Sequence, residues 1–339
     1  MGLQIGEIIT KKEIQFSDLS GKVIAVDAFN AIYQFLTTIR QPDGTPLKDS
    51  KGNVTSHISG LFYRNLNLIL EGVKLVYVFD GKAPDLKKRT QEGRREIREE
   101  MIQKYNEAKE MEDLEGMGKY SRADVHLDSK KIEESKELLL AMGIAVVFAP
   151  SEGEAQASYM AKEGIVYAAA SQDYDCLMFC APRLIQNLSL ARKRRTVSGY
   201  KEVYPQMIEL SKVLSELDIS HEQLICLGIL SGTDYNPGGV KGLGPKKSLK
   251  FVKEYGTKEN IFEALSKSDK YKIDFDWKEI YNEISCPKVD SNVKIEFPKI
   301  DKNKIKEILL KYEFSEERID NSLLKLDEVI SKKAQKTLF

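Results

Sequence analysis

Cysteine, histidine and long apolar runs are scarce in this chain of 339 residues. Its four cysteines are too few for a disulfide framework, and Cys176 and Cys180 have no neighbouring Cys or His pair that would complete a zinc site. The longest apolar run, Leu138 to Ala149, ends at Pro150 and is shorter than the roughly 18 residues of a membrane span. Since the start also lacks a signal-peptide pattern, we expect a protein that is neither secreted, nor embedded in a membrane, nor cross-linked by disulfides.

The net charge is zero because 52 basic residues balance 52 acidic ones, yet the bases are segregated. Residues 82–98 contain seven bases and three acids, and residues 192–201 and 241–253 contain bases but no acid. Net charge governs solubility, whereas local basic patches indicate partners such as nucleic acid. Any one of these runs is equally consistent with a solvated surface. Together with the carboxylates described below, the three runs favour a nucleic-acid partner.

Short β-branched and aromatic runs alternate with helical patterns along the first half of the chain. We expect buried strands at residues 22–27, 74–80, 145–149 and 165–170, and helices at residues 58–70 and 129–142. This alternation predicts an α/β fold with a mostly parallel central sheet flanked by helices. Ligands of such sheets bind at the carboxyl ends of the strands, where Asp27 and Asp80 are expected.

The rest of the chain departs from this alternation. Residues 85–128 are strongly charged, with a helix expected at 86–112, and they are too long for an ordinary connection. We interpret them as an inserted lid or arch, and the alternative is a solvent-exposed helical excursion. Further on, the patterns predict two strands joined across the basic run and helices up to the end of the chain: strands at 183–187 and 196–204, helices at 206–217 and 221–230, a glycine-rich hairpin from Gly232, and a helix from about Pro245.

Seven carboxylates follow predicted strands or form short pairs, and we call them the acidic cluster: Asp27, Asp80, Glu152, Glu154, Asp173, Asp175 and Asp234. In extended chain, the spacing of two residues within each pair points both side chains to one side. Converging carboxylates repel one another unless cations lie between them. Oxygen ligands without clustered His or Cys suit Mg²⁺ or Mn²⁺. Two such ions activate water and stabilise the leaving oxygen of a phosphodiester without a protein nucleophile. The alternative is that each acid is a solvated loop or capping residue.

The glycine-rich hairpin is not a nucleotide-binding P-loop. In GVKGLGPKK, residues 239–247, Pro245 occupies the position of the required Lys, and no strand precedes it. Glycines let backbone amides approach a phosphate, and the following helix N-terminus favours an anion. The hairpin is therefore interpreted as a grip on the DNA backbone that does not depend on base sequence.

These motifs resemble the flap endonucleases, the structure-specific 5′ nucleases of replication and repair, and most closely their archaeal form. The matching stretches occur in family order over about residues 1–255: VDA (26–28), IYQFL (32–36), TSH (55–57), FYR (62–64), VFDGK (78–82), PSEGEAQA (150–157), SQDYD (171–175) and GTDYNPGGVKGLGPKK (232–247). The resemblance implies a PIN-like 5′-nuclease core with a helical arch and a helix–hairpin–helix module. It also implies Mg²⁺-dependent 5′-flap endonuclease and 5′-3′ exonuclease activity in Okazaki fragment maturation and repair.

The resemblance further implies individual roles. One metal would be held mainly by Asp27, Asp80, Glu152 and Glu154, and the second near Asp173 and Asp175, with Asp234 acting through water. Lys87 and Arg94 would contact the scissile phosphate. A base would stack on Tyr33, and Arg40, Thr55 and Arg64 would contact the DNA and its 3′ flap. The other implied DNA contacts are Glu152, Gly232, Asp234, Gly239, Gly242, Gly244, Lys246 and Lys247. Some members of the family also hold a K⁺ ion at the helix–hairpin–helix. The amino terminus would lie near the active site.

The carboxyl terminus resembles a shortened sliding-clamp motif. Gln335, Leu338 and Phe339 match its glutamine, aliphatic and one of two aromatic positions, and the alternative is a frayed end. A clamp of the PCNA family would be the protein partner of an otherwise monomeric chain in the cytoplasm and nucleoid, or in the nucleus of a eukaryote. We expect a nuclease region at 1–98, an arch at 85–128, an intermediate nuclease region at 116–258 with the helix–hairpin–helix at about 220–255, a helical region at 259–329 and a clamp-binding tail at 330–339.

Two other functions stay open at this level. The first is a non-catalytic protein that delivers DNA junctions to the clamp, although such a protein has no need of seven carboxylates. The second is a nuclease of the same family that acts on bubbles, four-way junctions or RNA. The compact arch favours flaps over bubbles, and only through the resemblance.

Overall fold

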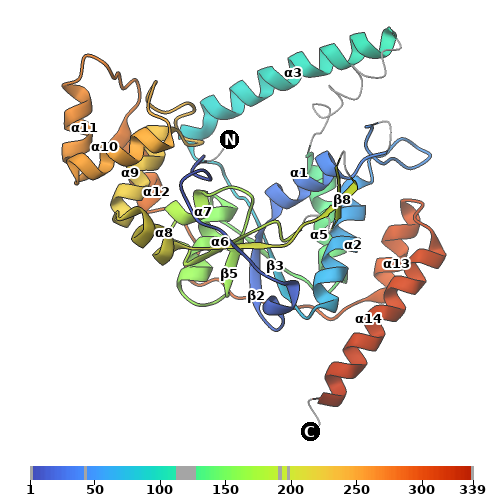
Figure 1. Cartoon of the computed structure of the whole chain (residues 1–339). Helices are drawn as coiled ribbons and strands as arrows, with labels where there is room; N and C mark the ends of the chain where they lie inside the picture. The colour runs from blue at the N-terminus through green and yellow to red at the C-terminus, as the bar shows by residue number, and fades with distance from the viewer. Residues whose placement is uncertain (1–2, 42–43, 112–126, 190–192, 197–198, 337–339) are drawn as a thin grey trace.

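The computed structural model describes residues 3–41, 44–111, 127–189, 193–196 and 199–336. A seven-stranded sheet lies at its centre with helices on both faces (Figure 1), in the strand order β1-β9-β6-β5-β2-β3-β4. The strands are β1 (Lys12–Glu13), β2 (Val23–Asp27), β3 (Lys74–Phe79), β4 (Ala145–Phe148), β5 (Ala168–Ala170), β6 (Arg183–Gln186) and β9 (Gln206–Glu209). The predicted α/β class is confirmed.

Five neighbouring strands, from β6 to β4, run parallel. At one edge β9 pairs with β6 in antiparallel orientation, and β1 in turn pairs antiparallel with β9. In the register of the centre, Ala25 lies between Val76 and Ala169. Because the strands are parallel, their carboxyl ends meet at one edge of the sheet, which brings together residues that are far apart in sequence.

Successive residues of the central strands enter different cores. Ile24 and Val26 of β2 pack into one apolar cluster, whereas Ala25 packs into the other, as the alternation of side chains in a strand requires. The first cluster includes α1 (Ala28–Thr38), α2 (Ser56–Leu70), α5 (Ser129–Ala141), α13 (Lys302–Lys311) and α14 (Glu316–Lys336). The second includes α6 (Gly153–Lys162), α7 (Asp175–Met178), α8 (Leu210–Leu217), α9 (His221–Ser231), α10 (Pro245–Tyr255), α11 (Lys258–Ser266) and α12 (Trp277–Ser285).

Helix starts follow local capping chemistry. Asp27, Asp128 and Ser220 each accept a hydrogen bond from a backbone N–H in the first turn of α1, α5 and α9, which satisfies donors that have no partner within the helix. Asp27 therefore ends β2 and begins α1 in a single residue. The carboxylate at the strand end is thus fixed by both elements.

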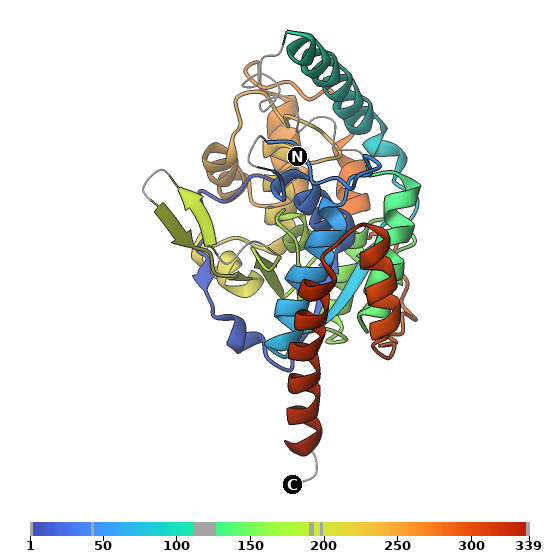
Figure 2. The ribbon, with the colours of Figure 1, turned by 90° about the vertical axis from the view of Figure 1, so that its right-hand side faces the viewer.

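A long helix extends away from the sheet within the predicted arch. A short 3₁₀ turn, η2 (Asp85–Lys87), leads into α3 (Lys88–Glu110), which projects from the body in both views (Figures 1 and 2). The ion pairs Arg95–Glu99 and Lys104–Glu100 span one turn of this exposed helix and add a few tenths of a kcal/mol each. The helix is confirmed, and residues 112–126 of the predicted arch lie outside the described residues.

Two predictions for the middle of the chain were wrong. Residues 206–209 form β9 rather than the start of a helix, because they pair with β6 at the sheet edge. The strand at 196–204 does not pair with 183–187 either. Instead β7 (Lys193–Thr196) and β8 (Gly199–Glu202) form a separate antiparallel hairpin out of the basic run itself. The hairpin projects from the body (Figure 2). Both errors arise from strand pairing, which local sequence patterns do not encode.

The helices after the sheet form two groups. Helices α9 to α12 pack together at one end of the molecule, whereas α13 and α14 pack against α2 and α5, and α14 then extends beyond the body (Figures 1 and 2). No helix in the described part of the chain is both long and apolar enough to cross a membrane.

Candidate functional site

The acidic cluster lies where the strand ends meet. Asp27 is the last residue of β2, and Asp80 directly follows β3. Glu152 and Glu154 lie at the start of α6, Asp173 and Asp175 at the start of α7, and Asp234 in the turn after α9. The charges of Asp80 and Asp173 act on Asp27, and the charge of Asp234 acts on Asp175. The structure therefore places these carboxylates within electrostatic reach of one another, as the sequence predicted.

The local geometry of the two pairs differs from the prediction. The pairs are not in extended strands but at helix N-termini: Glu152 is the N-cap of α6 and Asp175 the first residue of α7. A helical turn rotates successive side chains by about 100°, so Glu152 and Glu154 point toward different partners. Glu154 faces the interior of the cluster, while Glu152 faces Lys87 and Tyr235.

Hydrogen bonds from the protein orient three of the carboxylates. Gly153 N donates to Asp80 Oδ1 at 2.6 Å, Leu3 N to Asp175 Oδ1 at 2.7 Å, and Ser171 Oγ to Glu154 Oε1 at 2.5 Å. A Cβ on Gly153 would lie 2.7 Å from Asp80 Oδ1, so a side chain at this position would displace the carboxylate.

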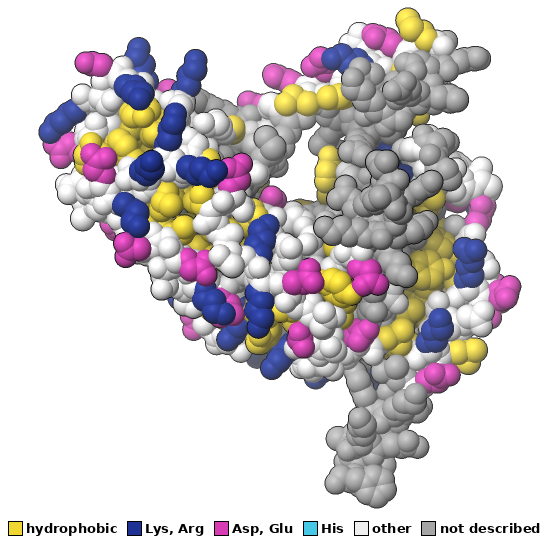
Figure 3. Space-filling model, in the orientation of Figure 1, with side chains coloured by type: hydrophobic (Ala, Val, Ile, Leu, Met, Phe, Trp, Pro, Cys, Tyr) yellow, Lys and Arg dark blue, Asp and Glu magenta, His cyan; other side chains and the backbone are white. Residues whose placement is uncertain are grey.

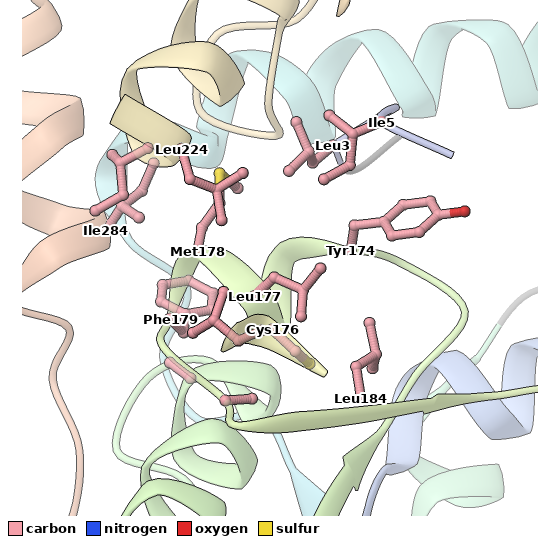
Figure 4. Packing of buried hydrophobic residues seen from close by; sticks show 14 of the residues in the cluster. Leu3, Ile5, Tyr174, Cys176, Leu177, Met178, Phe179, Leu184, Leu224 and Ile284 are labelled. Carbon is pink, nitrogen blue, oxygen red and sulfur yellow. The ribbon is translucent and has the colours of Figure 1, made fainter. Parts of the chain in front are cut away.

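The amino-terminal segment is part of this support. Leu3 and Ile5 are fully buried and lie beside Met178 and Tyr174 of the α7 region (Figure 4). This packing presents the Leu3 amide to Asp175. The implied position of the amino terminus near the site agrees with Leu3, while residues 1–2 lie outside the described residues.

Burial and mutual repulsion raise the pKa values of the cluster. For Asp27 and Glu154 the largest cause is burial, followed by neighbouring carboxylates, and both pKa values are well above their ordinary range. Burial also raises the pKa of Asp175 to about 7. Asp80 has exposed surface, but its carboxyl group is largely surrounded by protein. This burial and the charge of Glu152 raise the pKa of Asp80 to about 6. Concentrated negative charge of this kind is stabilised by cations.

Lys87 supplies one cation from the base of α3. Its Nζ forms an ion pair with Glu152, lies 4.0 Å from Asp234 Oδ2, and lies 4.9 Å from the centre of the Tyr235 ring. Burial by itself would lower the pKa of Lys87, but Glu152 and Asp234 outweigh it, and the net shift is upward. Thr90 Oγ1 donates to the carbonyl oxygen of Asp234, so the base of α3 is tied to the cluster at two points.

The donor set fits hard divalent cations. All seven side chains offer oxygen, and their repulsion is the kind that Mg²⁺ or Mn²⁺ relieves. Among the described residues, no three potential ligands already converge on one ion position. Asp80, Asp175 and Glu154 each accept a hydrogen bond from the protein through one carboxylate oxygen, and Glu152 pairs with Lys87.

The other implied contacts surround this edge of the sheet. Tyr33, on α1, is 44% exposed and available for stacking. Arg94 lies in the second turn of α3, and its side chain is outside the described residues. Arg40 donates to the carbonyl oxygens of Thr37 and Gly44 at 2.9 and 2.7 Å, so much of its guanidinium holds the loop after α1.

Arg64 lies on α2 and Thr55 is its N-cap residue, on the same side of the sheet as α1. Thr55 precedes the first residue of α2 and is buried. Arg64 is half-buried, and burial lowers the pKa of its guanidinium. Of these two residues, only Arg64 retains solvent contact sufficient for direct binding to a phosphate. The assignment of Thr55 as a direct DNA contact stays a prediction.

The glycine-rich segment forms a tight turn between α9 and α10. Gly232 and Gly239 both have positive φ, +103° and +56°, and a Cβ on Gly239 would lie 2.4 Å from Gly232 N. The two backbones touch at this point, which excludes side chains. Gly242 also has positive φ, and Gly244 is the N-cap of α10, followed by Pro245 in its first turn. The predicted helix–hairpin–helix geometry is confirmed.

Basic side chains accompany this turn. Lys246 and Lys247 are exposed in the first turn of α10, and Lys246 pairs with Glu7 at 3.3 Å. Lys and Arg side chains gather over the region of α10 and α11 in the space-filling view (Figure 3). Exposed cations beside a helix N-terminus are typical of a phosphate-binding surface.

At the carboxyl end, Gln335 lies in the last turn of α14. Its side chain, and Leu338 and Phe339 altogether, are outside the described residues. The clamp motif therefore stays a prediction.

Three contributors to the site were not predicted from the sequence. Tyr235 donates to Glu152 Oε2, Thr90 anchors α3, and the Asn30 side chain donates to Asp173 Oδ2 at 3.2 Å. Tyr235 and Asn30 occur within or beside the motifs that carry the family resemblance. Nothing in their sequence context shows which carboxylate each contacts, because those partners are distant in the chain.

Comparisons with known proteins agree with this geometry. The XPG N-terminal domain model matches residues 3–101, and the XPG I-region model matches residues 143–234. The chain is 50% identical to flap endonuclease 1 of Pyrococcus furiosus over 100% of this chain and 98% of the relative, and 47% identical to that of Hyperthermus butylicus over 96% and 94%.

Solved structures give the same result. The structure of flap endonuclease-1 from Methanococcus jannaschii has a TM-score of 0.75 at 41% identity, covering 98% of this chain and 100% of that chain. The catalytic core of Rad2 in complex with DNA substrate, with a TM-score of 0.72 at 24% identity over 96% and 100%, shares the fold. On its sequence, its strand topology and the carboxylates at its sheet edge, the chain belongs to the flap endonuclease family.

Proposed function

We propose that this chain cleaves DNA bearing a 5′ flap by phosphodiester hydrolysis at the junction of flap and duplex, in replication and repair. The observation that carries the proposal is the acidic cluster at the carboxyl edge of the sheet, with Lys87 from the base of α3 among its carboxylates. Seven carboxylates at one edge suit divalent cations, and Lys87 beside them suits a phosphate and not an apolar ligand. Family membership supplies the substrate class.

Two Mg²⁺ ions, or Mn²⁺ in their place, would activate the attacking water and stabilise the leaving oxygen when bound. The residues that would hold them are Asp27, Asp80, Glu152 and Glu154 on one side and Asp173, Asp175 and Asp234 on the other. Asp80, Glu154 and Asp175 are oriented by Gly153, Ser171 and Leu3. Preorientation of this kind lowers the cost of assembling the site during the reaction.

Lys87 is proposed to bind the scissile phosphate. It already lies among the carboxylates, and its elevated pKa keeps it protonated at any physiological pH. When its Nζ exchanges Glu152 for a phosphate oxygen, it stabilises charge that develops in the transition state. Arg94, in the second turn of α3, is proposed to assist from the helix that follows Lys87.

Substrate selection is proposed to rest on structure rather than base sequence. The turn between α9 and α10, with Lys246 and Lys247, would hold the duplex backbone, with K⁺ at the turn as a further proposal. Tyr33 would stack on a base near the cut, and Arg64 would contact the 3′ flap. An arch over residues 85–128 that admits only free 5′ ends would account for 5′-3′ exonuclease activity at nicks and gaps as well as flap cleavage.

The partners and location are proposals of the same kind. The carboxyl-terminal residues are proposed to bind a sliding clamp, with the chain otherwise monomeric. We place the protein at the nucleoid, in line with its archaeal relatives. The projection of α14 from the body as far as Lys336 supports the clamp proposal (Figure 2).

The test is cleavage of an end-labelled double-flap duplex with Mg²⁺ and with EDTA, beside a bubble and a single strand. We expect a Mg²⁺-dependent cut near the flap junction, with the bubble and the single strand spared. Tight flap binding without a cut in Mg²⁺ would instead favour a non-catalytic protein that delivers DNA junctions to the clamp. Preferential cutting of the bubble would show that the substrate class is wrong.

A further inference from the structure

Asn30 connects two carboxylates that come from different parts of the chain. It lies in the first turn of α1, three residues after Asp27. Its backbone N–H donates to Asp27 Oδ1 at 3.1 Å, and its side-chain Nδ2 donates to Asp173 Oδ2 at 3.2 Å. Asp27 and Asp173 are 146 positions apart in the sequence, so one residue bridges the end of β2 and the loop before α7.

Asp173 is a shared neighbour within the acidic cluster. Its charge raises the pKa values of Asp27, Glu154 and Asp175. A neutral donor on Asp173 fixes its direction and offsets part of its negative charge without adding a competing cation. Lys87, in contrast, pairs with Glu152 and Asp234 at the other side of the cluster.

We propose that Asn30 is a positioning residue, which sets the distance and orientation between Asp27 and Asp173 and thereby the affinity of the cluster for divalent cations. The inference rests on the proposed function, because it assumes that these carboxylates hold the metals. Partners that orient metal ligands typically contribute 10–100-fold to metal affinity or activity.

The two hydrogen bonds of Asn30 are separable, which makes the proposal testable. The bond to Asp27 comes from the backbone and is retained by any residue other than proline, so α1 keeps its cap. The bond to Asp173 comes from the side chain alone. Asn30→Ala therefore removes only the second bond, and Asn30→Leu also excludes a water molecule that would replace the lost donor.

Gln34 provides a matched control. It lies one turn further along α1, and its side chain accepts a hydrogen bond from Ser189 Oγ at 2.8 Å. Gln34→Ala therefore removes a carboxamide from the same helix without altering a bond to the acidic cluster. Thermal unfolding in EDTA should show that all three variants retain the fold.

The experiment is calorimetric titration of the full chain with Mn²⁺ in the absence of DNA, for wild type, Asn30→Ala, Asn30→Leu and Gln34→Ala. We expect the dissociation constant of at least one Mn²⁺ to rise tenfold or more in both Asn30 variants and to stay within twofold in Gln34→Ala. The Mn²⁺ concentration for half-maximal flap cleavage should rise in parallel, with a smaller loss of rate at saturating Mn²⁺.

Unchanged Mn²⁺ affinity in both Asn30 variants, with wild type active on flaps, would overturn the role of Asn30 and leave the proposed function intact. An equal loss of affinity in Gln34→Ala would also overturn it, because the effect would then belong to α1 in general. If wild-type protein neither binds Mn²⁺ nor cuts flaps, the proposed function fails and this inference fails with it.

Discussion

Replacing Lys87 with alanine should affect stability and catalysis in ways that depend differently on metal. Lys87 Nζ pairs with Glu152 and lies 4.0 Å from Asp234, and the side chain is 17% exposed. Removing it takes from these carboxylates, and from Asp175 and Asp80, a positive charge that acts on all of them. Loss of one partner from a buried ion pair costs about 3–5 kcal/mol, so metal-free Lys87→Ala should be destabilised by about that amount.

Divalent cations should reverse most of this loss, because they neutralise the same carboxylates. Cleavage should not recover, because the variant lacks the cation that is proposed to bind the scissile phosphate. The removal of one group that stabilises transition-state charge typically lowers the rate about 10²–10³-fold. We therefore expect Lys87→Ala to be unstable without metal, to be stable with metal, and to cleave slowly even with metal.

The assay is urea unfolding in EDTA and in Mn²⁺, combined with single-turnover cleavage of a flap substrate. Lys82→Ala is the control, since Lys82 is an exposed cation on the same segment. The reasoning is refuted if Lys87→Ala loses the same free energy of unfolding with and without Mn²⁺. It is also refuted if cleavage by Lys87→Ala equals that of Lys82→Ala.

Three further predictions follow from the geometry of the site. Asp175→Asn should abolish cleavage but not flap binding; in EDTA it should stabilise the protein by up to about 4 kcal/mol at pH 8 and by only about 1–2 kcal/mol at pH 5, because a pKa raised from 3.8 to about 7 means that stability falls as pH rises through that window. Tyr235→Phe, which loses the hydroxyl on Glu152 but keeps the ring beside Lys87, should lower the single-turnover rate about tenfold without weakening flap binding. Gly239→Ala should weaken duplex binding far more than Gly238→Ala, because only at Gly239 does the new Cβ meet backbone, 2.4 Å from Gly232 N, although both glycines have positive φ.

Each of these has a direct measurement and a contrary result. Urea unfolding at both pH values would contradict the assignment of Asp175 if the variant were no more stable than wild type at pH 8. For Tyr235→Phe, single-turnover kinetics at wild-type rate would show that its hydroxyl does not matter for Glu152. Fluorescence anisotropy with a labelled flap duplex measures the glycine variants, and equal affinities would contradict the close approach of the two backbones.

The amino-acid sequence by itself determined the class of fold and the residue types of the site. Its β-branched runs and helical periodicity predicted a parallel sheet, since burial on both faces requires continuous apolar strands. Aspartates at strand ends predicted where ligands bind, because the carboxyl ends of parallel strands share one edge. The glycines of the hairpin predicted a tight turn, because only glycine fits where Gly232 and Gly239 touch.

Only the tertiary structure decided how those residues meet. Strand pairing made residues 206–209 a strand and the basic run a hairpin, since an edge partner supplies hydrogen bonds that no local pattern shows. The start of α6 turned Glu152 and Glu154 toward different partners, and the packing of α1, η2 and the turn after α9 brought Asn30, Lys87 and Tyr235 to the acidic cluster. Their partners lie up to 147 positions away, as for Lys87 and Asp234, and contacts over such distances depend on three-dimensional packing rather than on periodicity.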